Sequence, residues 1–585
     1  MTAAPRWHVV GRGAGHVARH VAGQSRDEAT IIVLGDDLAE LDRLRCGPEE
    51  LAAHVIAAPE QVRWVFGDTT HWYPGILAGG ARVARCHDLR LCHAILTRSA
   101  LATDPAALRA AEEWDASSAV AEVPAPTLFD LDDAAPRSAG VPDDPDAALA
   151  ELRRQLAAVA SSSDPQRLRL LLAAESAGAL IAAELHAAGM PWSRAVHERI
   201  LTDLLGPRPA AGAAPARVLE LAAVVRDALG DPGASLDSQP KLLRSLHRVG
   251  VLARTTSRWE LADYDHPAIA PLLEYKKLTR LMSANGWAWL DEWASDGRFR
   301  PVYVPGGVVT GRWASSGGGA LQLPRRLRPA VRANPGWTLV VADVAQLEPR
   351  VLAAMSSDHA LADAARGRDL YDGIAASGIV TTRQEAKIAM LGAMYGATTG
   401  DSGRLVPALR RVYPRAMSLV DEAARTGAEG GVVSTWLGRT SPPADAFWRE
   451  AQDRAGAPDA TEADRARARR VAADRGRFTR NFVVQGTAAE WALAWLAELR
   501  TELARFPAVS AETTETAAAS GPVFGRGAHL CFFLHDEIIV HCPEDHAAAV
   551  ADAVRTAASR AARLLFGDFP IDFPLDLRIS ADAAK

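Results

Sequence analysis

The stretch TLVVADVAQLEPRVLAAM, residues 338–355, decides how this chain is interpreted. Its first part is a short apolar run typical of a buried strand, and a helical spacing of apolar residues begins a few positions later. Asp343 stands between the two, at the end of the predicted strand. Two interpretations are open for its carboxylate: it caps the following helix, or it faces a cleft and holds a cation.

A second acidic group lies in LCFFLHDEIIV, residues 530–540. Two apolar runs flank His535, Asp536 and Glu537, so these residues are predicted to occupy a tight turn between two strands. Turns favour Asp in solvent, but adjacent carboxylates repel each other and a divalent cation relieves that repulsion. The segment therefore predicts either a solvated turn or part of a metal site.

A cationic helix face is predicted in TTRQEAKIAMLGAMYG, which begins at residue 381. Arg383, Lys387, Leu391 and Tyr395 recur every four residues, so they share one face about 18 Å long. Two cations near the helix start and an aromatic near its end suit a triphosphate at one end and a base at the other. A solvated cationic face is the alternative for this pattern.

Two further segments carry polar residues that could contact nucleic acid. Arg477, Asn481 and Gln485 step by four residues in RFTRNFVVQGT, and Arg312 lies in the Gly- and Ser-rich stretch VVTGRWASSGGG. Taken alone, each of these is more common as an ordinary surface feature.

Together and in this order, the segments resemble the polymerase domain of family A DNA polymerases, the bacterial DNA polymerase I type, over about residues 170–585. The first segment is similar to the family motif D-Y-S-Q-I-E, the helix face to its fingers motif, and His535-Asp536-Glu537 to its third motif. Similar stretches also occur at Thr310-Gly311-Arg312, at GVVSTWLGR (431–439) and at LEYKKL (273–278). The resemblance implies an α/β multidomain chain with a right-hand fold of palm, fingers and thumb.

The resemblance also implies an activity, that of a template-directed DNA polymerase. Such an enzyme adds deoxynucleotides to a primer 3′ end by two-metal-ion nucleotidyl transfer and releases pyrophosphate. Primer–template DNA and deoxynucleoside triphosphates are the implied partners, and a monomer is expected. Replication and repair are the implied processes.

The resemblance assigns the catalytic centre to Asp343, Asp536, Glu537 and Lys387. Asp343 and Asp536 would ligate two Mg²⁺ ions about 3.5–4 Å apart, with Mn²⁺ as an alternative. Glu537 would support this site from beside it. Lys387 would be the general acid for the leaving pyrophosphate.

The remaining implied contacts fall into two sets. Those to the incoming nucleotide are Arg383, Lys387, Gln346, Glu348, Leu391, Tyr395 and Tyr371. Those to primer, template or the new base pair are Arg312, Arg477, Asn481, Gln485 and His535. Within the first set, Glu348 would be the steric gate against a ribose 2′-hydroxyl, and Tyr395 would lie near the templating base.

Three positions depart from the family pattern. Tyr371 stands where a phosphate-contacting His is frequent, and Pro349 follows the gate glutamate where Leu is usual. Leu391 replaces the Phe or Tyr that stacks against the incoming base and sugar, and such stacking is worth ~1–3 kcal/mol. We expect weaker nucleotide affinity or altered sugar selection, without loss of the chemistry.

The N-terminal segment, with FGDTTHWYPGIL, resembles the ribonuclease H-like proofreading 3′–5′ exonuclease domain of the same family. The expected first strand, TIIVLGDD, lacks the D-x-E that would bind metal, and Tyr73 stands where the second-motif Asp would be. No Y-x-x-x-D follows. A degenerate domain without exonuclease activity is expected, with a rearranged site at Asp68, Asp88 or the Asp36-Asp37 pair as the alternative.

Length and composition agree with several domains. A chain of 585 residues is too long for one core and implies roughly three or four domains. The predicted order is a degenerate exonuclease-like domain (1–118), a linker (119–165), the thumb (166–300), the first part of the palm (301–355), the fingers (356–504) and the second part of the palm (505–585).

The composition excludes some classes and locations. Hydrophobic residues make up 48% and charged residues 23%, which is ordinary for a globular protein. No apolar run reaches the ~18 residues of a membrane span, and five cysteines without C-x-x-C spacing predict neither disulfides nor zinc. A cytoplasmic, nucleoid-associated protein with no membrane partner is expected. The net charge of −6 does not exclude a local basic groove.

Two other functions remain open. A single-subunit RNA polymerase would use a similar palm and fingers, although Glu348 and the His535-Asp536-Glu537 turn favour deoxyribonucleotides. A catalytically weak DNA-binding or scaffold homologue is the other alternative, suggested by Leu391 and the degenerate N-terminal domain.

Overall fold

The computed structural model describes residues 5–12, 28–115, 140–210, 212–319, 323–396, 400–510 and 515–584. The chain forms two compact units. The first comprises Met1–Gly189, Val302–Gly317 and Asn334–Ser580. The second comprises Met190–Pro301, Gly318–Ala333 and Ala581–Lys585.

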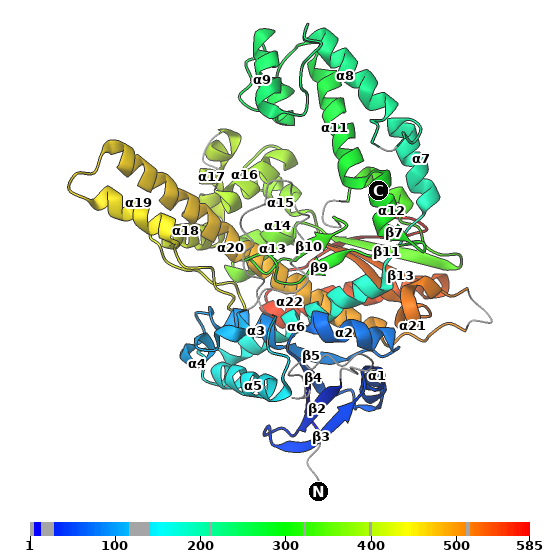
Figure 1. Cartoon of the computed structure of the whole chain (residues 1–585). Coiled ribbons are helices and arrows are strands. Elements are labelled where there is room, and N and C mark those ends of the chain that lie inside the picture. The colour runs from blue at the N-terminus through cyan, green and yellow to red at the C-terminus, as the bar shows by residue number, and fades with distance from the viewer. Residues whose placement is uncertain are drawn as a thin grey trace, which may run out of the picture. The chain divides into compact units, whose positions relative to one another are not determined.

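The N-terminal part of the first unit is built on a five-stranded sheet of order β3-β2-β1-β4-β5 (Figure 1). Its strands pair antiparallel from β3 to β1 and parallel from β1 to β5. Each face of the sheet borders its own hydrophobic core, and side chains alternate between the two faces along a strand. Val9 and Ile32 are buried on one face, and Val10 and Ile31 are buried on the other. The strands are β1 (Trp7–Arg12), β2 (Ala29–Leu34), β3 (Glu40–Cys46), β4 (Arg63–Phe66) and β5 (Arg85–Asp88).

Helices cover both faces of this sheet, which confirms the predicted small α/β domain. Side chains of α1 (Pro48–Ala57) and α2 (Thr69–Ala78) enter one core, and those of α5 (Pro145–Ala160) enter the other. One expectation was wrong: TIIVLGDD forms the second strand, not the first. The first strand, WHVVGR, has fewer apolar residues and was therefore missed, and it too carries no carboxylate.

Two predicted boundaries differ from the structure. Helix α5 lies inside the expected linker 119–165, because Asp144 caps it by accepting from the Ala147 N–H (2.8 Å), while Leu149 and Leu152 are buried against the sheet. The linker residues 119–139 lie outside the described ranges. Helix α6 (Pro165–Ala188), expected at the start of the thumb, belongs to the first unit and packs against α2 and β5.

A second sheet in the first unit contains four antiparallel strands in the order β12-β13-β11-β14. These are β11 (Trp337–Val344), β12 (His529–Leu534), β13 (Glu537–Pro543) and β14 (Leu575–Ser580). Helix α22 (Ala547–Phe566) packs against β11, β13 and β14, and the 42-residue helix α20 (Glu462–Leu503) packs against α22. Together with the turn after β11, this sheet positions the acidic residues found in the sequence.

A helical part follows the sheet. Its core is formed by α13 (Leu347–Met355), α14 (His359–Ala365), α15 (Leu370–Ala376), α16 (Arg383–Tyr395), α17 (Gly400–Val412) and α18 (Pro414–Ala428). Thr382 caps α16 by accepting from the Glu385 N–H, and Gly396, at φ +71°, ends it. Helix α19 (Ala446–Gly456) packs against α20, and the two form the long helical hairpin coloured yellow in Figure 1.

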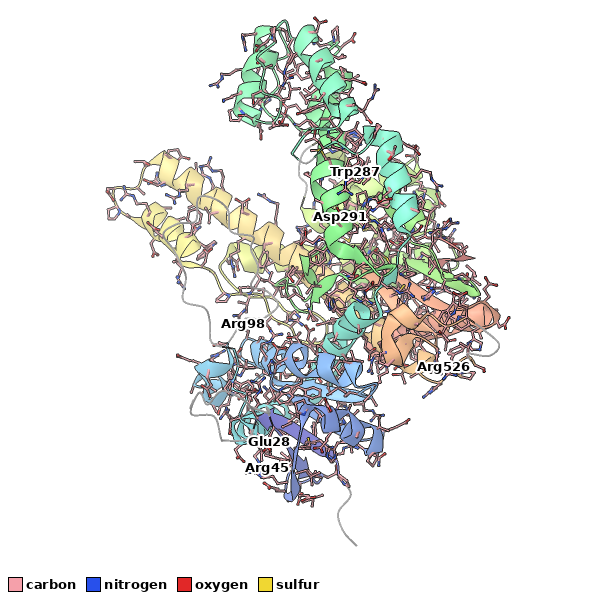
Figure 2. All side chains as sticks on the ribbon, turned by 45° about the vertical axis from the view of Figure 1, so that its right-hand side comes forward. Glu28, Arg45, Arg98, Trp287, Asp291 and Arg526 are labelled. Atoms are coloured by element: carbon pink, nitrogen blue, oxygen red, sulfur yellow. The ribbon has the colours of Figure 1, made fainter. Side chains whose placement is uncertain are left out.

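The second unit is largely helical. It contains α7 (Arg194–Leu205), α8 (Ala216–Ala228), α9 (Gln239–Arg248), α10 (Arg258–Leu261), α11 (Ile269–Asn285) and α12 (Trp287–Trp293). Trp192, Trp289 and Phe299 pack together at its base. Asp291 on α12, labelled in Figure 2, forms ion pairs with Arg194 and Arg208. Across the described parts of both units, no helix is long and apolar enough to cross a membrane.

Candidate active site

Asp343 and Asp536 lie at the same end of the four-stranded sheet. Asp343 is near the end of β11, directly opposite Glu537, which begins β13. Asp536 lies in the tight turn between β12 and β13, and its backbone carbonyl accepts from the Val344 N–H (2.9 Å). His535, the other turn residue, has the left-handed φ of +57°. The strand–turn–strand arrangement expected around these acids is therefore present.

Negative charge is concentrated at this end of the sheet, on Asp343, Asp536 and Glu537. Burial and the negative charge of Asp343 raise the pKa of Asp536 to about 6, and Glu537 adds to the effect. Among the described residues, no group of three His, Cys, Asp or Glu side chains converges as a preformed metal cage. The arrangement is thus a repelling carboxylate pair with room for further ligands.

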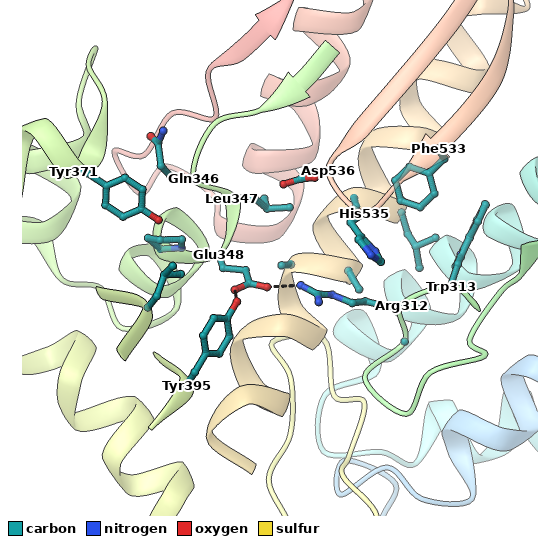
Figure 3. A pocket seen from close by; sticks show the side chains of 17 residues that line it. Arg312, Trp313, Gln346, Leu347, Glu348, Tyr371, Tyr395, Phe533, His535 and Asp536 are labelled. Atoms are coloured by element: carbon teal, nitrogen blue, oxygen red, sulfur yellow. Dashed lines mark hydrogen bonds and ion pairs between the residues drawn. The ribbon is translucent and has the colours of Figure 1, made fainter. Parts of the chain in front are cut away.

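A pocket of about 230 Å³ adjoins the acidic turn. The predicted site residues that line it are Arg312, Gln346, Glu348, Tyr371, Leu391, Tyr395, His535 and Asp536. Trp313 and Phe533, which sequence reasoning missed, form part of its wall (Figure 3). Their rings pack edge to face, 5.0 Å between centroids, and nothing local in the sequence marks this contact.

Glu348 lies at the centre of the pocket (Figure 3). One carboxylate oxygen accepts a hydrogen bond from Arg312, and the other accepts from the Tyr395 hydroxyl (2.5 Å). Three segments therefore meet on one side chain: the loop between β9 (Val302–Val304) and β10 (Ala314–Gly317), the start of α13, and the end of α16. These two hydrogen bonds hold the Glu348 side chain in place within the pocket.

The first cation of α16 is held by an acid that sequence reasoning did not place in the site. Arg383 donates to Asp369 (2.7 Å), and its guanidinium lies 5.6 Å from the centroid of the Tyr371 ring. The Gln346 amide donates to the same Asp369 oxygen (3.0 Å). Burial opposes ionisation of Asp369, but Arg383 and backbone N–H groups outweigh it and lower its pKa. The role was hidden because Asp369 also caps α15.

Arg350 is a second residue that was missed. Its side chain is fully buried and donates to Asp572 (3.0 Å) and to the carbonyls of Ala365 (3.1 Å) and Arg368 (2.8 Å). It joins the start of α13 to the segment before Asp369. A buried arginine has no signature in the sequence pattern, because the same residue type is ordinary on a helix surface.

The other residues of the α16 face are arranged as the helical spacing predicts. Lys387 is exposed, and Leu391 is partly buried at the pocket. Met390 and Met394 are buried in the helical core beneath this face. Asp343, Glu537, Arg383 and Lys387 do not line the pocket itself.

The predicted DNA contacts are divided between two places. Arg312 and His535 line the pocket. Arg477, Asn481 and Gln485 lie on α20 and do not. Arg477 instead lines a separate hollow of about 490 Å³, beside Arg480. The sequence spacing placed these three residues on one helix but gave no information on which cavity they border.

Tyr73 is the residue that stands where the exonuclease resemblance would place an aspartate. Tyr73 is fully buried, and its hydroxyl donates to Glu184 on α6 (2.7 Å). Glu184 also accepts from Arg82 (3.0 Å) and from Arg500 on α20. The side chain that replaces the expected aspartate is therefore part of the packing against α6.

The acids considered as a rearranged site are otherwise engaged. Asp68 pairs with Arg90 (2.9 Å) and caps α2. Asp88 accepts from the N–H groups of Thr69 and Leu91, both at 2.8 Å. Asp37 accepts from the Ala39 N–H in an exposed turn. Each of these carboxylates has a local structural partner.

Replacing Glu184 by Gln should destabilise the first unit by about 3 kcal/mol or more, because the buried Arg500 and the partly buried Arg82 lose their counter-charge. Burial opposes ionisation, but Arg500 and Arg82 lower the pKa of Glu184 from 4.5 to about 2. Its stabilisation is therefore present above pH 4.5 and lost as the pH falls from 4.5 through 2.

The measurement is urea unfolding of Glu184→Gln at several pH values. The control is Glu40→Gln, which removes an exposed pair with Arg43 and should cost less than about 1 kcal/mol. Equal unfolding midpoints for wild type and Glu184→Gln at pH 7 would contradict the prediction.

The site thus combines a carboxylate-bearing antiparallel sheet with a helix that carries two cations on one face. Residues 248–582, more than half of the chain, match the sequence profile of DNA polymerase family A. The chain belongs to this family.

Individual relatives of known sequence support this family membership. The chain is 27% identical over 345 residues to the thermostable DNA polymerase I of Thermus filiformis (54% of this chain, 36% of the relative). It is 28% identical over 321 residues to DNA polymerase I of Chloroflexus aurantiacus (50% and 30%). The matched region thus spans about a third of these relatives' length.

The polymerase domain of Pol1 from M. smegmatis, solved in complex with DNA primer-template and dNTP, has a similar structure. The TM-score is 0.66 at 17% identity, covering 99% of this chain and 97% of that one. This similarity confirms the predicted α/β multidomain polymerase fold.

Proposed function

We propose that this chain is a DNA-directed DNA polymerase that extends a primer 3′ end with deoxynucleoside triphosphates and releases pyrophosphate. The observation that carries the proposal is the position of Asp343 and Asp536 beside the Glu348 pocket, in a chain that belongs to DNA polymerase family A. The M. smegmatis polymerase domain was solved with DNA primer-template and dNTP, which supports the same partners here.

Two Mg²⁺ ions fit the residues present, with Mn²⁺ as an alternative. Asp343 and Asp536 offer hard oxygen donors. Burial and, second, the negative charge of Asp343 raise the pKa of Asp536, and a cation between the two carboxylates would relieve both effects. Mg²⁺ is usually held by one or two carboxylates plus substrate phosphates, so a complete protein cage is not needed. The ions would activate the 3′-hydroxyl and neutralise the leaving pyrophosphate. Glu537 would hold the turn that carries Asp536.

The start of α16 would hold the triphosphate. Arg383 has a half-exposed side chain, so its pair with Asp369 can be exchanged for phosphate oxygens at little cost. Lys387, one turn further along, would bind the same phosphates and protonate the leaving group. Tyr371 lies against Arg383 and would support its guanidinium from the side.

The pocket would hold the sugar and base. Glu348, fixed by Arg312 and Tyr395, would lie under the deoxyribose beside Gln346 and exclude a 2′-hydroxyl. Leu391 would contact the base, and Tyr395 would lie near the templating base. Primer and template would contact Arg312, His535, Arg477, Asn481 and Gln485. The proposed domain roles are exonuclease-like for 1–118, thumb for the part of 166–300 that follows α6, palm for 301–355 and 505–585, and fingers for 356–504.

The proposal is tested by extension of a labelled primer on a longer template with Mg²⁺ and the four dNTPs. Full extension that EDTA stops is expected. DNA binding without extension in Mg²⁺ or Mn²⁺ would indicate the scaffold alternative. Preferential use of ribonucleotides would indicate an RNA polymerase.

Leu391→Phe and Leu391→Tyr should tighten the apparent affinity for incoming nucleotides. An aromatic ring adds stacking worth ~1–3 kcal/mol, about five- to hundredfold. The gain is limited because Met390 and Met394 fill the space behind this face. Insertion kinetics with ordinary and 3′-deoxy nucleotides measure the effect. Identical values for all three proteins would mean that position 391 does not touch the nucleotide.

The protein should not remove a mismatched 3′ end when nucleotides are absent. Tyr73 is packed against Glu184, and the first strand carries no acid, so the metals of proofreading would lack ligands. The measurement is degradation of a labelled mismatched primer with Mg²⁺. Degradation that is lost in an Asp68→Asn/Asp88→Asn variant would contradict the prediction and identify a rearranged site.

A further inference from the structure

A buried charge cluster lies behind the pocket and takes no part in the chemistry proposed above. Arg439 pairs with Glu175 on α6 (2.7 Å), and the Glu175 side chain is 1% exposed. Glu490 on α20 is equally buried and accepts from the Thr435 hydroxyl and the Leu437 N–H. The cluster therefore brings together three charged side chains from three parts of the first unit, two carboxylates and one guanidinium.

The segment that carries Arg439 is fixed. The Arg439 N–H donates to the Thr435 hydroxyl (2.9 Å), and the Trp436 N–H donates to Thr487 on α20 (3.0 Å). The Ser99 hydroxyl donates to the Gly438 carbonyl (2.7 Å). This backbone is anchored on both sides, and the ion pair with Glu175 holds the Arg439 guanidinium.

The loop that carries Arg312 rests on this guanidinium. Gly311 has φ +85°, and a Cβ built on it would lie 2.6 Å from Arg439 Nε and 3.0 Å from Cζ. Within the described residues, Arg439 Nε has no hydrogen-bond partner, as expected of an edge covered by backbone. At the other end of the loop, a Cβ on Gly306 would lie 2.8 Å from Glu175 Oε1. Both ends of the loop thus contact the Arg439–Glu175 pair.

One peptide separates this contact from the pocket. Arg312 follows Gly311 and donates to Glu348, which in turn accepts from Tyr395 (Figure 3). A shift of the Gly311 peptide would therefore move the guanidinium that fixes Glu348. The displacement would therefore reach the Glu348 carboxylate.

We propose that Arg439 is a positioning residue for sugar selection. Its guanidinium, held by Glu175, supports the backbone of Gly311. It thereby fixes Arg312 and, through Arg312, the Glu348 carboxylate that would exclude a ribose 2′-hydroxyl. This rests on the proposed function, because selection is read from nucleotide incorporation. Arg439 does not line the pocket, and its effect passes through Arg312.

The test compares dNTP and rNTP insertion by Arg439→Lys with that of the wild type. Lysine keeps the charge opposite Glu175 but lacks the flat group under Gly311. We expect relative ribonucleotide use to rise on the order of tenfold, with a smaller change in kcat for dNTPs. Arg500→Lys, a buried paired arginine in the same unit, should leave the ratio unchanged.

A double-mutant cycle with Glu348→Ala separates positioning from general damage. Since Arg439 acts through Glu348, Arg439→Lys should add no further loss of selection in the Glu348→Ala background. Full additivity, or equal losses for dNTPs and rNTPs, would overturn the inference. If Arg439→Lys does not fold, Gly311→Ala disturbs the same contact from the loop side. The same rise in relative ribonucleotide use, and the same lack of further loss in the Glu348→Ala background, are then expected of Gly311→Ala. Absence of any extension by the wild type would instead contradict the proposed function.

Discussion

Asp343→Asn and Asp536→Asn should each lower primer extension by about 10³-fold or more. Both substitutions keep the shape of the side chain but remove the negative charge that holds the metals, and such ions supply several kcal/mol of charge stabilisation. DNA binding should change little, because the phosphate backbone is neutralised by cations elsewhere.

Single-turnover insertion kinetics and a DNA-binding titration check both parts. Asp576, opposite Asp343 on the neighbouring strand β14, offers a matched control. It is exposed and is assigned no role, so Asp576→Asn should extend normally. Extension by Asp343→Asn or Asp536→Asn within tenfold of the wild type would remove these residues from the catalytic role.

Glu348→Ala should raise ribonucleotide incorporation relative to deoxyribonucleotide on the order of 10²-fold, the scale at which a pocket rejects an added hydroxyl. Glu348 is held on both oxygens, by Arg312 and Tyr395, so it is a rigid barrier rather than a mobile side chain. Removing it leaves space for the 2′-hydroxyl and frees both partners.

Competition between rNTP and dNTP at one template position measures this effect. Glu348→Gln is the matched variant, because it keeps the bulk and loses the charge that attracts Arg312. If bulk alone excludes ribose, Gln should retain most of the selection. Unchanged selection in Glu348→Ala would show that another residue forms the barrier.

The acidic turn and the α16 face could be predicted because their signals are local. Asp536 is bracketed by apolar strands, and the four-residue spacing from Arg383 to Tyr395 is a property of one helix. The pairing of Asp343 with Glu537 is not local, because the two strands are far apart in the sequence. That the two strands lie close together could be expected only from the family resemblance.

The parts that were missed depend on tertiary contacts or on weak composition. Asp369 has the ordinary signature of a helix cap, which concealed its contact with Arg383. Helix α5 lies in an Ala-, Pro- and Asp-rich stretch that is typical of a linker, and its stability comes from Leu149 and Leu152 packing on the sheet. The proposed positioning role of Arg439 depends on the tertiary contact between its guanidinium and the backbone of Gly311, which no local sequence pattern indicates.

If this chain copies a DNA template, the template base decides which dNTP is added. The most direct measurement is single-nucleotide incorporation opposite each of the four template bases, with each dNTP offered alone in Mg²⁺. Every template base is expected to select its complementary dNTP, with a preference of at least about 10²-fold set in the Glu348 pocket. Incorporation that ignores the template base, or none at all by protein that still binds primer–template DNA, would contradict it.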